Sequence, residues 1–418
     1  MDIINNLVKN LGDGIAAGIY GALGQGIAAD ILIMVIAAIA VFAVASGGFA
    51  GLTYAERKIV ARIQDRVGPN QAGPYGILQP IADAVKLFTK EDTTPAEADF
   101  WVYHLAPIIV AVFATLTFTV VPFAPGVVGT NLNIGAFYII AIGSASTIAI
   151  LMAGWGSNNK YSLLGAFRTV AQLVGYEVPM LLNMLPVIML TGSMSLVDII
   201  ERQAGWNGSW GLPFIVILPL SGLAFLISGI AETGRSPFDL LEAESEIVAG
   251  FHVEYSGMKF GLIMMGEYMN ALGVAVMFSV LFLGGYAGPI LPPYLWLVLK
   301  AFGVFLVLMW LRGTLPRVRI DQLLNMNWKF FVPLSVVNLI LVMILGKVFV
   351  SDPALFKANG GILIQPLAQA LIMGASSFAL LMIALAIVTR RVRKDRMAEA
   401  AILLQRRETN QQIAASVH

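Results

Sequence analysis

The sequence predicts an all-α, polytopic membrane protein with about nine transmembrane helices. Its 418 residues are 58% hydrophobic and only 12% charged, against roughly 25% charged in ordinary soluble domains. Its apolar runs are close to the ~20 residues that a helix needs to cross the hydrocarbon core, and its basic residues gather in alternate loops. The predicted spans cover residues 30–53, 100–122, 135–155, 167–192, 213–231, 258–285, 294–311, 330–350 and 366–389.

The placement of Lys and Arg predicts the orientation of these spans. Basic residues follow the first span, flank the start of the fourth, follow the seventh and fill the tail at 390–418, whereas the opposite loops are nearly bare. The positive-inside rule therefore puts the N-terminal segment 1–29 outside and the tail in the cytoplasm, which agrees with an odd number of spans. The start MDIINNLVKNLGDG lacks the basic n-region of a cleaved signal, so we expect the first span to direct membrane targeting.

The first cytoplasmic loop, residues 54–99, is too long for a plain connector. Its GPN and GPYG sequences mark turns, and the residues after them alternate with the period of a helix. We expect an amphipathic helix that lies at the membrane interface or packs on a partner. Its apolar stripe is Ile77, Ile81, Ala84, Val85 and Phe88, and its polar stripe is Gln79, Asp83, Lys86 and Lys90.

Composition excludes several classes of chemistry from this chain. Without cysteine there is no disulfide, thiolate metal site or iron–sulfur cluster, and three histidines far apart make a poor metal set. A net charge of +1 gives no basic face for nucleic acid. Walker A, dinucleotide-binding and nucleophile-elbow motifs are absent from the sequence. Any redox centre is therefore expected in a partner.

Acidic residues are concentrated in the window 231–257, which contains AETGRSPFDLLEAESEIVAGFHVEYS. Ionisable groups beside or inside spans are costly, and they commonly mark an ion or proton path. On a helix, Asp239, Glu242 and Glu246 would share one face while Glu244 points away. The acids of this window and the following turns are Glu232, Asp239, Glu242, Glu244, Glu246, Glu254 and Glu267, answered by the cations Arg235 and Lys259.

The fourth predicted span carries Glu177 inside an apolar run, close to Pro179 and Pro186. Proline in a span frees backbone carbonyls, which is tolerated only where protein or water is near. Glu177 is therefore expected to face other helices or a wet cavity. The alternative is a protonated carboxyl that hydrogen-bonds a neighbouring helix as packing. Glu267, in the sixth predicted span, has the same character.

Four long stretches resemble the H subunit of the proton-pumping NADH-quinone oxidoreductases, complex I. They are ERKIVARIQDRVGPNQAGPYGILQPIADAVKLFTKE, GWGSNNKYSLLGAFRTVAQLVGYEVPM, AETGRSPFDLLEAESEIVAGFHVEYS and RGTLPRVRIDQLLNMNWKFFVPL. The resemblance covers roughly residues 30–350, an eight-helix core. It implies an arch of tilted helices between a peripheral redox arm and antiporter-like membrane subunits. It also implies a narrow chamber for a lipid quinone and a chain of carboxylates that leads from the chamber into the membrane.

Carried over by motif, the resemblance assigns site residues. Around the quinone chamber it implies Arg57, Lys58, Arg66, Arg235 and Phe238, with Arg168 as a supporting cation. Along the proton path it implies Asp83, Glu177, Glu232, Asp239, Glu242, Glu244, Glu246, Glu254 and Glu267. The ninth span in 351–389 and the basic tail at 390–418 lie beyond the family core.

The resulting expectation is a membrane subunit that couples quinone reduction to proton translocation in a bacterial plasma membrane, with an organellar inner membrane as the weaker alternative. Quinone is its substrate, and flavin and iron–sulfur clusters belong to partner subunits. The expected partners are the peripheral-arm quinone-site and terminal-cluster subunits, the antiporter-like subunits and the lipid bilayer. One alternative is an autonomous cation/proton antiporter, which the lack of visible repeats argues against. Others are the equivalent subunit of a membrane-bound hydrogenase-type complex and a structural anchor, which the acidic window argues against.

Overall fold

The computed structural model describes residues 13–15, 17–21, 26–204, 212–239, 250–349 and 371–390, and the regular elements in those ranges are helices. Eight helical segments there are long and apolar enough to cross a membrane, which confirms the predicted all-α, polytopic fold. The segments are α2 (Ile27–Ile63), α4 with the turn after it (Phe100–Thr119), α5 (Gly135–Gly156), α6 (Lys160–Thr191), α10 (Gly257–Phe282), α11 (Pro293–Thr314), α12 to α13 (Ile320–Lys347) and Leu371–Arg390.

The fifth predicted span, 213–231, is wrong as a single membrane-crossing helix. The structure divides it into α8 (Phe214–Ile217) and α9 (Pro219–Glu232), and Leu218 between them has φ −125° and ψ 57°. Pro219 cannot donate a backbone hydrogen bond to the preceding turn, so the helix breaks there. With 14 residues, α9 is shorter than the ~20 that a span needs.

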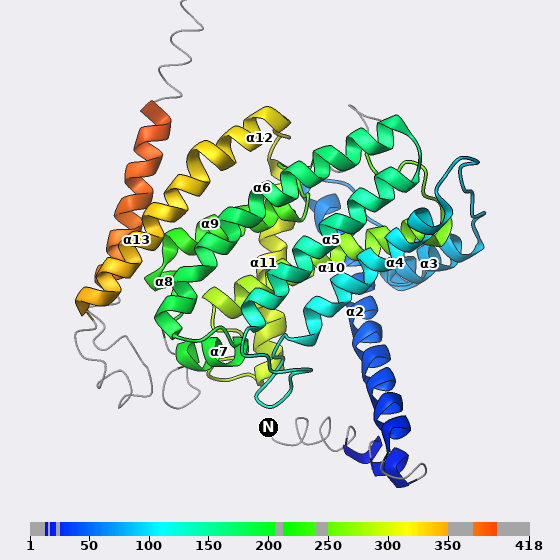
Figure 1. The fold of residues 1–418 in the computed structure, drawn as a ribbon, viewed down its shortest axis with the longest axis horizontal. Coiled ribbons are helices and arrows are strands. Elements are labelled where there is room, and N and C mark those ends of the chain that lie inside the picture. The colour runs from blue at the N-terminus through cyan, green and yellow to red at the C-terminus, as the bar shows by residue number, and fades with distance from the viewer. Residues whose placement is uncertain are drawn as a thin grey trace, which may run out of the picture.

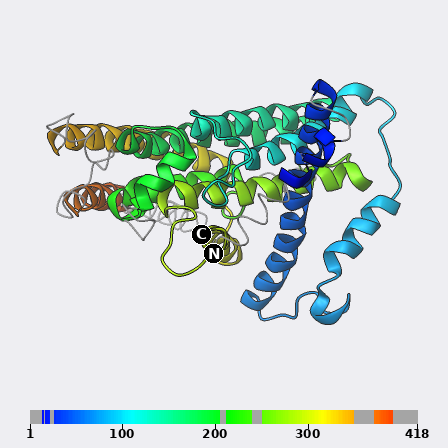
Figure 2. The same ribbon diagram turned by 90° about the horizontal axis from the view of Figure 1, so that it is seen from below.

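Helices α4, α5, α6, α9 and α10 pack together in the middle of the molecule (Figure 1). Helix α5 packs between α4 and α6, α6 also packs on α9, and α10 packs on α4. Figure 2 shows α2 at one end of the molecule, beside the loop that contains α3 (Gln79–Thr89), and α13 (Val332–Phe349) with the segment Leu371–Arg390 at the other. A short helix, α7 (Leu196–Ala204), lies between α6 and α8 in the chain.

Helix α3 is the amphipathic helix that the sequence predicts in the first loop. Its apolar side chains are exposed, with Ile81 at 61%, Val85 at 56% and Phe88 at 70%. The described part of this chain therefore does not cover the apolar face of α3, as expected for a helix that rests on a membrane surface or a partner.

Three prolines lie inside the described helices α4 and α6, and for two of them, Pro107 and Pro179, a distant side chain binds the backbone carbonyl that the proline frees. Pro107 in α4 cannot donate to the carbonyl of Tyr103, four residues earlier; the hydroxyl of Tyr255 donates to that oxygen instead, at 3.1 Å. Pro179 in α6 likewise frees the carbonyl of Gly175, and Nδ2 of Asn327 donates to it at 2.6 Å. The prolines thus create contacts between segments far apart in the chain.

The C-terminal end of α10 is held in the same way. The side-chain amide of Gln203, on α7, donates to the carbonyls of Val280 and Leu281 at 2.9 and 3.2 Å. The ammonium group of Lys300, on α11, donates to three further carbonyls at 2.7–2.9 Å. These belong to Leu283, Gly285 and Ala287. The last carbonyls of a helix have no partner within it, so these two side chains tie α7, α10 and α11 together.

Replacing Tyr255 with Phe removes only the hydroxyl that binds the carbonyl of Tyr103. We expect the free energy of unfolding to fall by about 1 kcal/mol, measured by thermal unfolding of the purified protein in detergent. In the Tyr255→Phe background, Pro107→Ala restores a backbone N–H for the same carbonyl and should recover much of the loss. Tyr161→Phe, at an exposed tyrosine, is the control. No recovery in the double variant would contradict the account.

Candidate functional site

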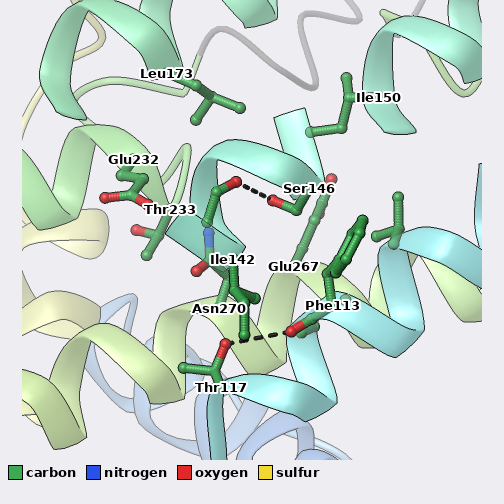
Figure 3. Close-up of a pocket in the computed structure, with 14 residues that line it drawn as sticks. Phe113, Thr117, Ile142, Ser146, Ile150, Leu173, Glu232, Thr233, Glu267 and Asn270 are labelled. Carbon is green, nitrogen blue, oxygen red and sulfur yellow. Dashed lines mark hydrogen bonds between the residues drawn. The ribbon is translucent and has the colours of Figure 1, made fainter. Parts of the chain in front are cut away.

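A small cavity lies between helices α4, α5, α6, α9 and α10 (Figure 3). Its volume of about 40 Å³ has room for two or three water molecules at ~10–15 Å³ each. Much of its lining is apolar, from residues such as Val110, Ile142 and Leu173. Its polar lining residues are Thr117, Ser146, Glu232, Thr233, Glu267 and Asn270.

Glu232 reaches the cavity because α9 ends there. Its side chain belongs to the last residue of that helix and is only 7% exposed. A β-carbon at Gly143, on α5, would lie 3.1 Å from Oε1 of Glu232. A larger residue at that position would therefore press on the carboxylate.

Glu177 binds the turn of α5 that begins at Gly143. The hydroxyl of Ser144 donates to Oε2 of Glu177 at 2.9 Å, and that of Thr147 lies 3.5 Å from Oε1. One turn of α5 thus contacts Glu177 on α6 and Glu232 on α9. The glycine leaves space for one carboxylate, and the hydroxyls donate to the other.

The structure brings together three of the predicted path acids and separates others. Glu232 and Glu267 line one cavity, and Glu177 contacts the α5 turn beside it. Glu254 lies apart, where Nδ2 of Asn159 donates to Oε1 at 2.6 Å. Asp83 pairs with Arg57 on α2 at 2.6 Å, and Asp239 is partly buried. The remaining predicted path acids, Glu242, Glu244 and Glu246, lie outside the described residues.

Helix α6 anchors both ends of the acidic window. Upstream, the buried amide Nε2 of Gln172 donates to the carbonyls of Ala231, at 2.6 Å, and Phe238, at 2.9 Å. Downstream, the hydroxyl of Ser162 donates to the carbonyl of Phe251 at 2.8 Å. The helix that also carries Glu177 therefore holds both described ends of the window.

A buried charge cluster that the sequence reasoning missed lies near the start of this window. Arg235 binds Oε1 of Glu56 at 2.7 Å, and Arg312 on α11 binds the same oxygen. Glu56 is 4% exposed, and the guanidinium of Arg235 also lies 4.3 Å from the ring centre of Tyr268. These contacts hold α2, α10 and α11 to the segment after α9. The first span was predicted to end at residue 53, but α2 continues to Ile63. The sequence signal for the cluster was Glu56, an acid one turn beyond the apolar run, for which Arg235 in the acidic window was a possible partner.

The residues predicted for the quinone chamber fall in three places. Arg57, Lys58 and Arg66 lie in or just after the end of α2, where Arg57 is about half exposed and Nε of Arg66 donates to Gln64 at 2.7 Å. Arg235 belongs to the buried cluster. Phe238 is buried, with its ring centre 5.7 Å from that of Tyr176. The predicted supporting cation, Arg168, is partly buried on α6.

Comparison with known proteins identifies the family. A family model described as NADH dehydrogenase matches residues 33–343. The H subunit of NADH-quinone oxidoreductase from Dehalococcoides mccartyi (strain CBDB1) is 52% identical over 286 residues, 68% of this chain and 79% of that protein. The chain belongs to the family of NADH-quinone oxidoreductase H subunits. The H 2 subunit of Geobacter sulfurreducens is 45% identical over 326 residues, which are 76% of this chain and 97% of that protein. The H subunit of Rickettsia typhi is 47% identical over 298 residues, which are 70% of this chain and 87% of that protein.

Membership of this family confirms the resemblance seen in the four motifs and places the chain among the subunits of an enzyme complex. The match ends at residue 343, so the segment Leu371–Arg390 lies beyond the family model. Both acids that line the cavity and the cluster of Glu56, Arg235 and Arg312 lie inside it.

Replacing Glu56 with Gln would leave two arginines close together with no carboxylate between them. Removing one partner of a buried ion pair costs about 3–5 kcal/mol, so we expect severe loss of the assembled protein from membranes, measured by immunoblot and thermal unfolding. Adding Arg312→Met removes one surplus charge and should restore part of the loss. Asp321→Asn, which breaks an exposed pair with Arg319, should change little. Equal effects of the two acid substitutions would be inconsistent with a buried cluster.

Proposed function

We propose that this chain is the membrane subunit of an NADH-quinone oxidoreductase in which quinone binding near the cytoplasmic face drives proton movement through buried carboxylates. The observation that carries this proposal is the polar cavity that holds Glu232 and Glu267, with Glu177 bound to the α5 turn beside it. Acids at membrane depth are costly, so they are rare and commonly mark an ion or proton path.

A second contact supports coupling between the acidic window and this cavity. One side-chain nitrogen of Gln172 binds the carbonyl of Phe238 and that of Ala231, the residue before Glu232. A displacement of the window at Phe238 would therefore act directly on the end of α9. We assign Phe238 and Arg235 to the wall of the quinone chamber, with Arg57, Lys58 and Arg66 at its cytoplasmic edge and Arg168 as a supporting cation.

In the proposed mechanism, electrons from NADH reach quinone through flavin and iron–sulfur clusters in partner subunits. Reduction of quinone changes the charge beside the acidic window, and the window shifts. Protons then redistribute among Glu232, Glu267 and Glu177, and the change passes to antiporter-like neighbours. Asp83, Asp239, Glu242, Glu244, Glu246 and Glu254 are proposed to line the cytoplasmic part of the path.

The proposed orientation follows from the basic loops. The N-terminus lies outside, the C-terminus lies in the cytoplasm, and the chain resides in a bacterial plasma membrane. This puts the paired Arg57 and Asp83 and the start of α10 on the cytoplasmic side, where a peripheral redox arm would dock.

Glu177→Gln and Glu232→Gln keep the size of each side chain but remove its ability to exchange a proton. In the assembled complex, we expect proton pumping to fall by about tenfold or more, with little loss of subunit content. The measurement is quinone-dependent NADH oxidation together with acidification of inside-out vesicles. Asp198→Asn, on α7 and bound to Ser193, is the control. Normal turnover and pumping in both glutamate variants would refute the relay.

A further inference from the structure

The break between α8 and α9 leaves the carbonyl of Val216 without a backbone donor. In a continuous helix the N–H of Leu220 would donate to that oxygen. Here Leu218 has non-helical dihedral angles, φ −125° and ψ 57°, and no described backbone N–H donates to Val216. The break lies inside the apolar run 213–231. Lipid offers no donor, so an open break would expose a costly polar group to the bilayer.

Neighbouring helices supply partners for two other polar groups at the break. The N–H of Phe214, the first residue of α8, donates to Oε1 of Gln203 on α7 at 3.2 Å. The hydroxyl oxygen of Ser221, in the first turn of α9, accepts a hydrogen bond from Nδ2 of Asn338 on α13 at 2.7 Å. These contacts hold the break from α7 and from α13, but they do not involve the oxygen of Val216.

The segment Leu371–Arg390 contacts that oxygen. A β-carbon at Gly374 would lie 2.5 Å from the carbonyl oxygen of Val216, which is closer than real β-carbons approach any atom. Glycine therefore allows the two backbones to meet, as small residues do between membrane helices. The hydrogen that takes the place of the β-carbon points at the oxygen, so a weak Cα–H···O contact replaces the missing hydrogen bond.

The rest of the segment has one buried face and one exposed face. Met373, Ser377 and Ala384 are buried, at the spacing of one side of a helix, whereas Phe378 is exposed. Met373 belongs to the same apolar cluster as Ile217 of α8. In Figure 1 the segment lies at the end of the molecule where α8 and α13 lie. It is therefore docked on the described core along one face.

We propose that the segment Leu371–Arg390, called the closing helix below, is a built-in partner that binds the α8–α9 break and keeps lipid from the carbonyl of Val216. The closing helix lies beyond the family model, which ends at residue 343. Helix α9 runs without interruption from the break to Glu232. The closing helix thus also fixes the first turn of the helix that carries this acid.

The test measures hydrogen–deuterium exchange in the purified, assembled complex, read by mass spectrometry on peptides of this chain. Gly374→Leu places a side chain where the oxygen of Val216 lies and should displace the closing helix. We expect the amides of residues 214–224 to exchange at least about tenfold faster, because an open break has less protection from solvent. Peptides from α5 should keep the wild-type rate, which would exclude general unfolding.

Ala375→Leu is the matched control, because it adds the same side chain at the next position, which is exposed. It should leave exchange at the break unchanged. If Gly374→Leu does not assemble, Gly374→Ala takes its place, since a β-carbon alone comes too close to Val216.

Unchanged exchange at the break in the Gly374 variant, or an equal rise in Ala375→Leu, would overturn the closing helix. A faster exchange confined to the break would support it. Both outcomes are independent of the carboxylate relay, because exchange at residues 214–224 is read without proton pumping. A complex that pumps only with intact Glu177 and Glu232 but shows no change in Gly374→Leu keeps the proposed function and loses the closing helix.

Discussion

The structure depends first on the requirement that backbone polar groups inside a bilayer find partners within the protein, because lipid offers none. Pro107 and Pro179 each free a carbonyl, and Tyr255 and Asn327 supply the missing donors. These donors come from the end of the acidic window and from the segment before α13. Each missing helical hydrogen bond is therefore replaced by a contact between distant segments. In a membrane protein with few polar residues, these polar contacts help to fix the packing of the helices.

The same requirement for partners within the protein applies to the buried charged residues. One turn of α5 accommodates two carboxylates by different means: Gly143 provides space beside Glu232, and Ser144 donates a hydrogen bond to Glu177. Glu56, by contrast, is paired with Arg235 and Arg312. The described part of the chain thus holds buried acids in two kinds of surroundings. Glu56 pairs with arginines and holds helices together, whereas Glu177 and Glu232 lie among hydroxyls and apolar side chains.

The sequence was sufficient for the helical fold and the family, because long apolar runs and long motifs are local signals. It also singled out Glu177, Glu232 and Glu267, which the structure places at or beside one cavity and whose role in a proton path stays a prediction. Three features had a weaker local signal or none. The break before Pro219 lies inside a continuous apolar run. Hydropathy places the end of the first span before Glu56, whereas α2 continues beyond it. Nothing in the sequence around Gln172 indicates a special role, and only the fold shows that its side chain binds the carbonyls of both Ala231 and Phe238.

Helix α6 connects the described ends of the acidic window to an acid inside a predicted span. Ser162, Gln172 and Glu177 lie along this one helix, and they contact the end of the window, its beginning and the α5 turn beside the cavity. Packed helices rearrange between discrete positions rather than deforming continuously. A shift of the window that breaks the bond between Gln172 and Phe238 would leave the carbonyl of Phe238 without that donor. It therefore carries a free-energy penalty of about 1–3 kcal/mol, comparable to the coupling free energies by which two sites in a protein communicate.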